Sequence, residues 1–330
     1  MIVDVRTGRV IAHEDAFRKW YPASLTKLMT AYITFKAVKA GRLSLDSPVT
    51  MSKKAADQPA SKMYFKPGSK LTLDSALKLL LVKSANDVAV AIAETVGGTL
   101  DEFIAMMNGE AARLGMKSTH FINPHGLPGK GQYSTARDLA VLALQLKREF
   151  PEHAGYFALE GVSTGKKNYA NFNMLVGRFD GADGMKTGFI CAAGFNQVSS
   201  ATRNGRTVIS VVLGSDSLAG RADDSAELLQ KGLSAPLGKG VPLSALAPYG
   251  DTFTMNDISA EICNPKAAKV RSEGRDDAGR MIVHSPYIRE RTQPPLYSFA
   301  GLIPGSEVAA SKKGQNEIAN VPIPLPRPSF

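Results

Sequence analysis

The chain has few cysteines and no long apolar runs, and these absences exclude several classes of protein. Only two of its 330 residues are cysteines, Cys191 and Cys263. A disulfide framework and a cysteine-rich zinc site are both excluded, while a single disulfide between the two stays open. No apolar stretch reaches the roughly 18 residues that a membrane-crossing helix needs. Residues 1–8 also lack the basic segment, apolar run and cleavage site of a signal peptide. The protein is therefore either cytoplasmic or represented without its export signal.

Acidic residues are fewer than basic ones, with 30 Asp and Glu against 40 Lys and Arg and a net charge of +10. The basic residues form no long run, and the densest spots are scattered lysine pairs such as Lys53-Lys54 and Lys166-Lys167. Two interpretations stay open, a well-solvated surface and a face that binds a polyanion. Hydrophobic residues make up 44% of the chain, which excludes a disordered protein.

Proline is scarce in the first part of the chain and common at the end. Seven of the 19 prolines precede residue 236, and the other 12 follow in the last 95 residues. A proline-rich region with little apolar periodicity is typical of extended, unpacked chain. We therefore expect one folded domain over residues 1–235, followed by a largely extended or disordered region over residues 236–330.

The apolar pattern of residues 1–235 predicts strands at both ends of the domain and helices between them. Two short strands joined at Thr7-Gly8 are predicted at residues 2–5 and 9–12, and alternating residues predict strands at 183–190, 194–201 and 207–213. Apolar residues at helical spacing predict helices at residues 23–40, 75–83, 87–96, 100–114, 135–150 and 222–233. Asp74, Thr99 and Ser134 are the expected N-caps of three of them. This order favours an α+β fold in which the two ends of the domain close one antiparallel sheet with helices on its faces.

Three short motifs stand in a suggestive order along the domain. They are Ser24-Leu-Thr-Lys27 (S-x-x-K), Ser84-Ala-Asn86 (S-x-N) and Lys186-Thr187-Gly188 (K-T-G). S-x-x-K alone is weakly diagnostic, because two further matches begin at Ser75 and Ser163. Ser24 differs from both, since it opens a long apolar helix, where free backbone N–H groups and the positive end of the helix dipole lie close to its hydroxyl.

The residue types in these motifs suit nucleophilic catalysis. A serine hydroxyl such as that of Ser24 is a poor nucleophile until a base takes its proton. Lys27 lies one helical turn away, and a lysine can act as that base when burial and another cation lower its pKa. Lys186 is the candidate second cation. Ser84 can pass a proton to a leaving amine, and Asn86 can bind a substrate carbonyl or hold Lys27.

The third motif lies on an expected strand. There it offers an edge for an extended peptide, a cation and hydroxyl for an anionic group, and a glycine that permits close approach. Taken singly, each motif is more typical of ordinary structure: a hydroxyl at a helix start, an interhelix cap, a strand ending in a turn. Taken together, they fall on the elements that acyl transfer requires and favour that chemistry.

At these residues the sequence resembles the penicillin-recognising serine hydrolases, and more narrowly the low-molecular-weight penicillin-binding proteins that are D-alanyl-D-alanine carboxypeptidases. The matching segments within residues 1–235 are Pro22–Ala31, Lys66–Gly68, Leu80–Asp87, Asn123–Leu127, Tyr133–Asp138, Asp183–Gly188 and Gly220-Arg221. The resemblance implies a β-lactamase/transpeptidase-like fold, in which an all-helical lobe lies beside the sheet, and it implies no cofactor.

The resemblance also implies a reaction. Ser24 would attack the penultimate D-Ala carbonyl of a peptidoglycan stem peptide, release the last D-Ala and form an acyl-enzyme that water hydrolyses. Lys27 would be the general base, Ser84 and Lys186 would complete the proton relay, and Asn86 would position the substrate. β-Lactam antibiotics would be covalent inhibitors.

The implied binding groups surround the K-T-G motif. The oxyanion would lie between the backbone N–H groups of Ser24 and Phe189, the residue after Gly188. Thr187 and Arg221 would hold the terminal carboxylate, a task that suits a guanidinium group.

The sequence departs from the family pattern in three places. Phe189 and Ile190 stand where the family commonly has His and Thr, and the segment Asn171-Phe-Asn173 lacks an arginine that is common there. The family commonly adds a β-rich second domain and a C-terminal amphipathic helix, and residues 236–330 show neither pattern. The tail therefore gives no support to peripheral membrane association.

The expected location follows from the family resemblance, and the expectations about metals and nucleic acid follow from the residues. The family works outside the cytoplasmic membrane, so we expect a periplasmic or extracytoplasmic enzyme whose chain lacks its export signal. The five histidines have no metal-ligand spacing, and we expect His125 to hold a turn rather than to catalyse. Nucleic acid is disfavoured, because aromatic and basic residues do not alternate on a recognisable platform.

Two rival functions stay open. A class A β-lactamase shares the three motifs but needs a water-activating glutamate in an E-x-x-L-N-like loop. None of the glutamates between the second and third motifs has that context; these are Glu94, Glu102, Glu110, Glu149, Glu152 and Glu160. The other rival is a catalytically impaired cell-wall-binding module, in which the changes at Phe189 and Asn171 have abolished hydrolysis.

Overall fold

The computed structural model describes residues 1–238, 240–266, 269 and 281–308. Its central sheet has five antiparallel strands in the order β2-β1-β9-β8-β7. The strands are β1 (Ile2–Asp4), β2 (Val10–Ala12), β7 (Ala182–Ile190), β8 (Gly194–Arg203) and β9 (Arg206–Ser215). Ile2 pairs with Ser210, so the two ends of the domain meet in the sheet as expected. β7, the strand with the K-T-G motif, forms one edge.

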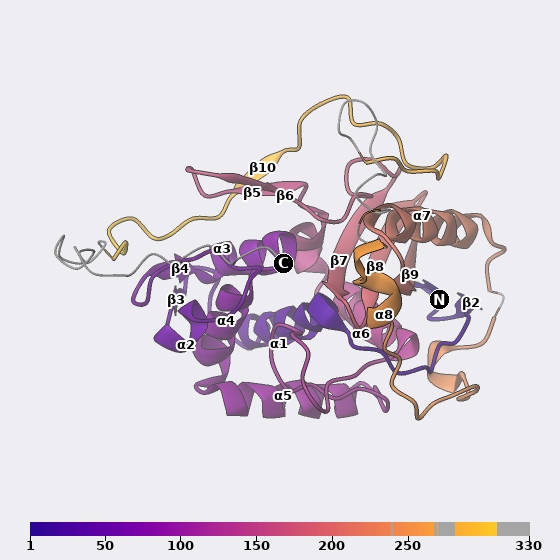
Figure 1. Cartoon of the computed structure of the whole chain (residues 1–330), viewed down its shortest axis with the longest axis horizontal. Helices are drawn as coiled ribbons and strands as arrows, with labels where there is room; N and C mark the ends of the chain where they lie inside the picture. Colours follow the sequence, from indigo (N-terminus) through magenta and orange to yellow (C-terminus); the bar gives the residue numbers. More distant parts are fainter. Residues whose placement is uncertain (239, 267–268, 270–280, 309–330) are drawn as a thin grey trace, which may run out of the picture.

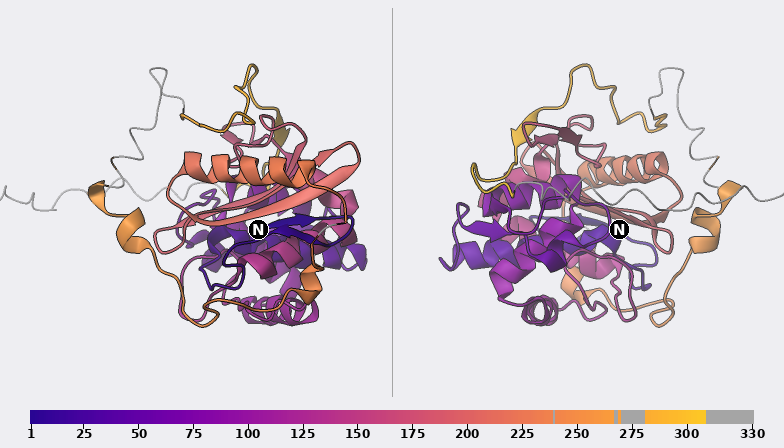
Figure 2. Two further views of the ribbon diagram at one scale, coloured as in Figure 1. Left: turned by 90° about the vertical axis from the view of Figure 1, so that its right-hand side faces the viewer. Right: turned by 60° about the vertical axis from the view of Figure 1, so that its left-hand side comes forward.

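Helices cover both faces of this sheet, which confirms the α+β class (Figures 1 and 2). Helix α7 (Leu218–Ser234) packs on β8 and β9 through Ala222, Ala226 and Leu229. Helix α6 (Ala136–Glu149) packs on the other face. No helix among the described residues is long and apolar enough to cross a membrane.

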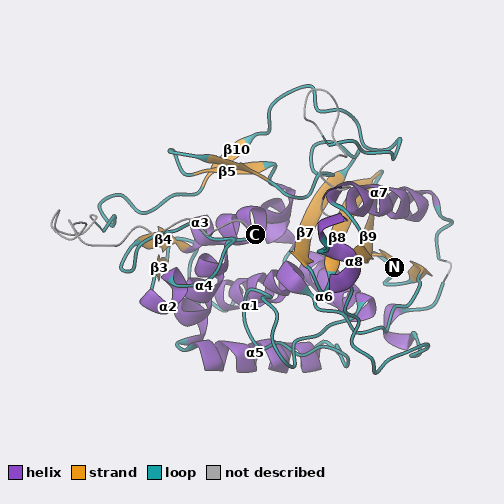
Figure 3. Ribbon diagram, viewed as in Figure 1, coloured by secondary structure: helices purple, strands orange, loops and turns teal. Residues whose placement is uncertain are grey.

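A helical lobe lies beside the sheet (Figure 3). Its elements are η1 (Ala23–Thr26), α1 (Lys27–Lys39), α2 (Lys53–Ala56), α3 (Leu73–Lys78), the π-helix η2 (Leu79–Lys83), α4 (Asn86–Gly97) and α5 (Leu100–Arg113). The 3₁₀-helix η3 (Pro151–Ala158) follows α6. Thr99 caps α5 in a capping box, as expected. Two other expected caps are wrong, because a neighbouring threonine takes the role: Thr72 caps α3 in place of Asp74, and Thr135 caps α6 in place of Ser134.

Several elements differ from the expected ones in length or type. The helix expected at 23–40 begins as a 3₁₀ turn, and that expected at 75–83 changes to a π-helix after Lys78. Helix α7 begins four residues earlier than expected, where Ser217 caps it. The structure adds a two-stranded sheet of β3 (Pro48–Thr50) and β4 (Lys70–Thr72). It also adds a three-stranded sheet of β10 (Tyr297–Phe299), β5 (Gly161–Ser163) and β6 (Asn168–Ala170). Strands of three residues are too short to show alternation.

Parts of the chain after residue 235 pack on the domain, while most of the described residues there are exposed or half-buried and outside regular elements. β10 pairs in parallel with β5, and Leu243 and Ile288 are buried in the apolar clusters of the domain. A disulfide joins Cys191, directly after β7, to Cys263, which follows the short helix α8 (Ser259–Ile262). The 3₁₀-helix η4 (Leu243–Ala245) is the other regular element there. The sequence Val321–Pro328 lies outside the described residues, and the boundary at 235 stays a prediction.

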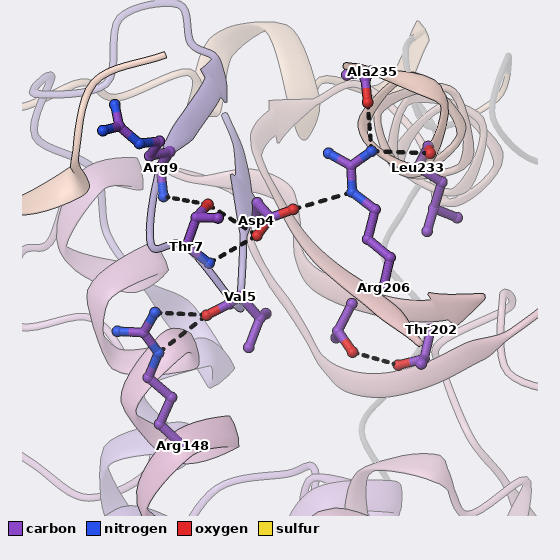
Figure 4. Close-up of polar contacts among 10 residues, drawn as sticks. Asp4, Val5, Thr7, Arg9, Arg148, Thr202, Arg206, Leu233 and Ala235 are labelled. Carbon is purple, nitrogen blue, oxygen red and sulfur yellow. Dashed lines mark hydrogen bonds and ion pairs between the residues drawn. The ribbon is translucent and has the colours of Figure 1, made fainter. Parts of the chain in front are cut away.

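A network of polar contacts holds the first strand in place (Figure 4). The guanidinium of Arg206, on β9, donates from Nε to Asp4 Oδ2 at 3.0 Å and also reaches the carbonyls at the end of α7. Arg148, on α6, donates from Nε to the carbonyl of Val5 at 3.0 Å. The strand is thereby joined to both helical layers as well as to its sheet neighbours.

Candidate functional site

Ser24 lies at the tightly packed junction between the helical lobe and the sheet. It follows Ala23, whose φ of +47° is unusual for a residue with a side chain. Gly126, with φ of +89°, packs against this turn so closely that a Cβ there would lie 1.7 Å from the Ala23 carbonyl oxygen. On the other side, a Cβ at Gly188 would lie 3.0 Å from the Ser24 nitrogen. Two glycines thus allow three chain segments to converge on the hydroxyl.

Lys27 begins helix α1 and is fully buried beneath Ser24. Its Nζ lies 3.0 Å from Ser24 Oγ, 2.8 Å from Asn86 Oδ1 and 2.7 Å from the carbonyl oxygen of His125. Two roles were expected for Asn86, and the structure shows one of them: its side chain holds Lys27. Its Nδ2 donates to the carbonyl of Pro59 at 3.0 Å.

Burial and neighbouring cations set the charge of the buried lysines. Burial, and then the nearby Lys186, hold the pKa of Lys27 well below its usual value. Burial, and then Arg221, lower the pKa of Lys186 to about 7. Burial also lowers the pKa of Arg221, to about 10. The expected pair of environments, a depressed lysine beside a second cation, is therefore present.

Ser84 lies between η2 and α4 in a left-handed turn, with φ of +61°. Its Oγ is buried and has no hydrogen-bond partner among the described residues, and the residue lines the same cleft as Ser24. Lys186 Nζ donates to the Thr187 carbonyl at 2.9 Å. The structure therefore brings the three motifs together, but no direct hydrogen bond links Ser84 to either lysine.

The residues converge on a cleft with a volume of about 380 Å³. It is lined by Ser24, Ala60, Ser61, Ser84, Asn86, His125, Gly126, Leu127, Phe172, Thr187, Gly188, Phe189, Ile190, Phe195, Leu218 and Arg221. No carboxylate belongs to this lining within the described part of the chain. Arg221, on α7, is buried and donates to the Phe172 carbonyl at 3.2 Å.

The end of β7 shapes the wall next to Ser24. Gly188 lies against the turn that carries Ser24, and Phe189, the next residue of β7, lines the same cleft as Ser24. The Phe189 ring is half-exposed and packs on Phe195, its partner across the strands, with ring centroids 4.3 Å apart. The family departure at Phe189 thus builds an apolar wall at this end of β7.

Some site residues gave little indication in the sequence. His125 does hold a turn, since its Nδ1 accepts from the Leu127 N–H at 3.1 Å, but its carbonyl also holds Lys27. Burial and then the charge of Lys27 lower the pKa of His125 to about 3, so the ring is neutral. Ser61 and Phe172 come from loops of no regular pattern. Only the segment Asn123–Leu127, which is part of the family resemblance, could have indicated that a backbone carbonyl would hold Lys27.

A model of the D-alanyl-D-alanine carboxypeptidase family matches residues 1–217. The chain belongs to this family. The match covers all three motifs and most of the sheet, so the family resemblance and the fold expected from it are both confirmed.

Curated relatives of this carboxypeptidase-family chain align over most of the same region. It is 38% identical over 239 residues to D-alanyl-D-alanine carboxypeptidase DacC of Escherichia coli, covering 70% of this chain and 60% of that protein. It is 34% identical over 218 residues to DacF of Bacillus subtilis, covering 65% of this chain and 56% of that protein. The chain thus spans about three fifths of the length of these relatives.

Solved structures of family members superpose on the same region. The D-alanyl-D-alanine carboxypeptidase DacD of Francisella tularensis is 37% identical with a TM-score of 0.69, over 71% of this chain and 69% of that one. Penicillin-binding protein D2 of Listeria monocytogenes, solved in a cefotaxime-bound form, is 31% identical with a TM-score of 0.65, over 71% of this chain and 95% of that one.

Proposed function

We propose that this chain hydrolyses the terminal D-Ala from peptidoglycan stem peptides through an acyl-enzyme on Ser24. The observation that carries the proposal is the position of Lys27, whose Nζ is fixed by Asn86 and the His125 carbonyl 3.0 Å from Ser24 Oγ. A buried amine whose pKa is depressed can be neutral at physiological pH, and it can then accept the hydroxyl proton.

Acylation in this cleft would move one proton in two steps. The proton goes from Ser24 to the base and then from the base to the leaving amine. Lys27 takes the proton of Ser24 as Oγ bonds to the penultimate D-Ala carbonyl carbon. The N–H groups of Ser24 and Phe189 stabilise the oxyanion, and such a donor is worth about 3 to 4 kcal/mol in known hydrolases. The C–N bond then breaks, and the Ser84 hydroxyl passes the proton to the departing amine of D-Ala. Water hydrolyses the ester and frees Ser24.

The substrate would be aligned by the edge of β7 and by the cationic end of the cleft. Thr187 and Arg221 both line the cleft and suit a C-terminal carboxylate, which a guanidinium group can bind through two hydrogen bonds. Lys186, whose pKa the charge of Arg221 helps to lower, would contribute positive charge to this region when protonated. Asn86, which holds Lys27 and lines the cleft, would also contact the peptide backbone. β-Lactams, which carry an equivalent carboxylate, would acylate Ser24 and act as inhibitors.

The β-lactamase alternative has no support from the cleft. Rapid release of a penicilloyl group needs a carboxylate that activates water, and no described lining residue supplies one. We therefore expect penicillin to stay bound to Ser24 for minutes or longer. Mass spectrometry after incubation with penicillin tests this: an adduct on a peptide that contains Ser24 is expected, and rapid turnover of a chromogenic cephalosporin contradicts it.

A second assay, the release of D-Ala from a peptide, separates an enzyme from an impaired wall-binding module. Release of D-Ala from diacetyl-Lys-D-Ala-D-Ala is expected from the unmodified chain and not from Ser24→Ala. Binding to sacculi without any release would favour the module. We place the activity outside the cytoplasmic membrane, because the proposed substrate is part of the cell wall. The proposed partners are stem peptides, and we propose no nucleic-acid partner.

A further inference from the structure

Lys83 is a cation that contacts two residues of the cleft lining and that the proposed reaction does not use. It ends η2 directly before Ser84 and is partly buried. Its Nζ donates to Ser61 Oγ at 2.9 Å and lies 5.4 Å from the ring centroid of Tyr169 and 5.6 Å from that of Phe172. Ser61 and Phe172 both line the cleft. The ammonium group is therefore held at one side of the substrate space.

The charge of Lys83 is not balanced by an ion pair within the described residues. The closest candidate, Asp87, raises the pKa of Lys83 only as the smallest of three influences. Both of its carboxylate oxygens accept backbone N–H groups, one from Val88 and the other from Met63 and Tyr64. Burial, followed by the nearby charge of Lys167, lowers the pKa of Lys83. An anion bound near Lys83 would favour its charged form and so oppose the lowering of its pKa.

Phe172 is a shared neighbour of Lys83 and Arg221. Its carbonyl accepts from Arg221 at 3.2 Å, and its ring centroid lies 5.6 Å from Lys83 Nζ. Strand β6, which carries Tyr169, packs over η2 and completes this wall. Arg221, Phe172 and Ser61 line the cleft, and Lys83 contacts both Phe172 and Ser61, so its charge acts on the part of the cleft that these residues share with Arg221.

We propose that Lys83 is a second cation, beside Arg221, that selects substrates with a free C-terminal carboxylate. The inference rests on the proposed function and adds a specificity residue to it. Lys83 is a positioning residue that acts through Ser61 and through the field in this part of the cleft. A partly desolvated charge contact of this kind is worth about tenfold in binding.

The test compares Lys83→Gln, Lys83→Arg and a matched control, Lys54→Gln, which removes a remote exposed lysine on α2. Each chain is assayed with diacetyl-Lys-D-Ala-D-Ala and with its C-terminal amide. For Lys83→Gln we expect KM for the acid to rise about tenfold with kcat little changed. The preference for acid over amide should fall by the same factor. Lys83→Arg should restore most of the loss, and Lys54→Gln should match the unmodified chain.

The possible results separate the two proposals. If the unmodified chain releases no D-Ala from the acid, the proposed function fails, and the inference with it. The inference alone is wrong in two cases in which the unmodified chain is active. In the first, Lys83→Gln has an unchanged KM for the acid; in the second, its KM rises equally for the acid and the amide. Thermal unfolding of each variant shows whether a rise in KM arises from misfolding. If Lys83→Gln is misfolded, Lys83→Arg decides, and a failure of that variant to restore KM overturns the inference.

Discussion

The close contact between Gly188 and the turn at Ser24 predicts a sharp effect of a single methyl group. In Gly188→Ala the new Cβ would lie 3.0 Å from the Ser24 nitrogen, 3.2 Å from the Leu25 nitrogen and 3.2 Å from the Pro22 carbonyl oxygen. All three are backbone atoms, so β7 and η1 must separate by a few tenths of an ångström. That movement widens the space between the two N–H groups proposed to bind the oxyanion.

The size of the effect follows from the geometry. Complete loss of one oxyanion donor costs about 100- to 1000-fold in kcat, and a misplacement of about 1 Å costs about 100-fold. A shift of a few tenths of an ångström should therefore slow acylation about 10- to 100-fold. The backbone at Gly188 has no positive φ, so alanine adds no backbone strain and the fold should remain.

The assay is the second-order rate of acylation by benzylpenicillin, measured with thermal unfolding of the same preparations. Gly109→Ala is the matched control, because this glycine lies within α5, and a Cβ there would meet nothing within 4 Å. The control should acylate normally and gain up to about 1 kcal/mol in stability. The reasoning is refuted if Gly188→Ala acylates within twofold of the unmodified chain.

Three further predictions concern charge and the disulfide. Lys186→Met should raise the pKa of Lys27, because the Lys186 charge lowers it, so the acidic limb of the pH profile of acylation should move to higher pH; a shift downward would contradict this. Cys263→Ser should lower the free energy of unfolding by about 2 to 4 kcal/mol in denaturant, because the disulfide spans 72 residues; an unchanged midpoint would refute it. Asp183→Asn should destabilise the domain by about 1 to 3 kcal/mol at neutral pH, because it removes the negative charge that lies 2.7 Å from the buried ammonium of Lys147. The Asp183 pKa is lowered, so its contribution is present above 3.8 and is lost as pH falls through the folded value. Denaturant unfolding at several pH values checks this, and a difference that persisted in acid would contradict it.

The long periodic segments and the catalytic motifs could be predicted from the sequence, because they depend on residues that lie near one another in the chain. Strands β7 to β9 and helices α4 and α5 each have enough residues for their apolar pattern to repeat. Ser24 and Lys27 are one turn apart on any helix, so their meeting does not depend on the rest of the fold.

Features that depend on distant contacts were not readable. The π-helix before Ser84 and its left-handed turn are stabilised by packing against other elements, and local pattern predicted a plain helix end. The pairing of β10 with β5 and the disulfide at Cys191 need segments far apart in sequence to meet. Lys83 looked like an ordinary helix lysine, because its aromatic neighbours follow it by more than eighty residues.

The place of β1 inside the sheet also governs the order in which the domain can fold. Ile2 pairs on one side with Ala12 of the nearby strand β2, but its partner on the other side, Ser210 of β9, follows it by more than 200 residues, so β1 can join the rest of the sheet only late. Ser24 and its helix emerge early, whereas the β7 edge that faces them is among the later segments. A nascent chain halted before residue 182 therefore has its nucleophile but no opposite wall, and it should not react with penicillin. The cleft is assembled only when the two ends of the domain meet.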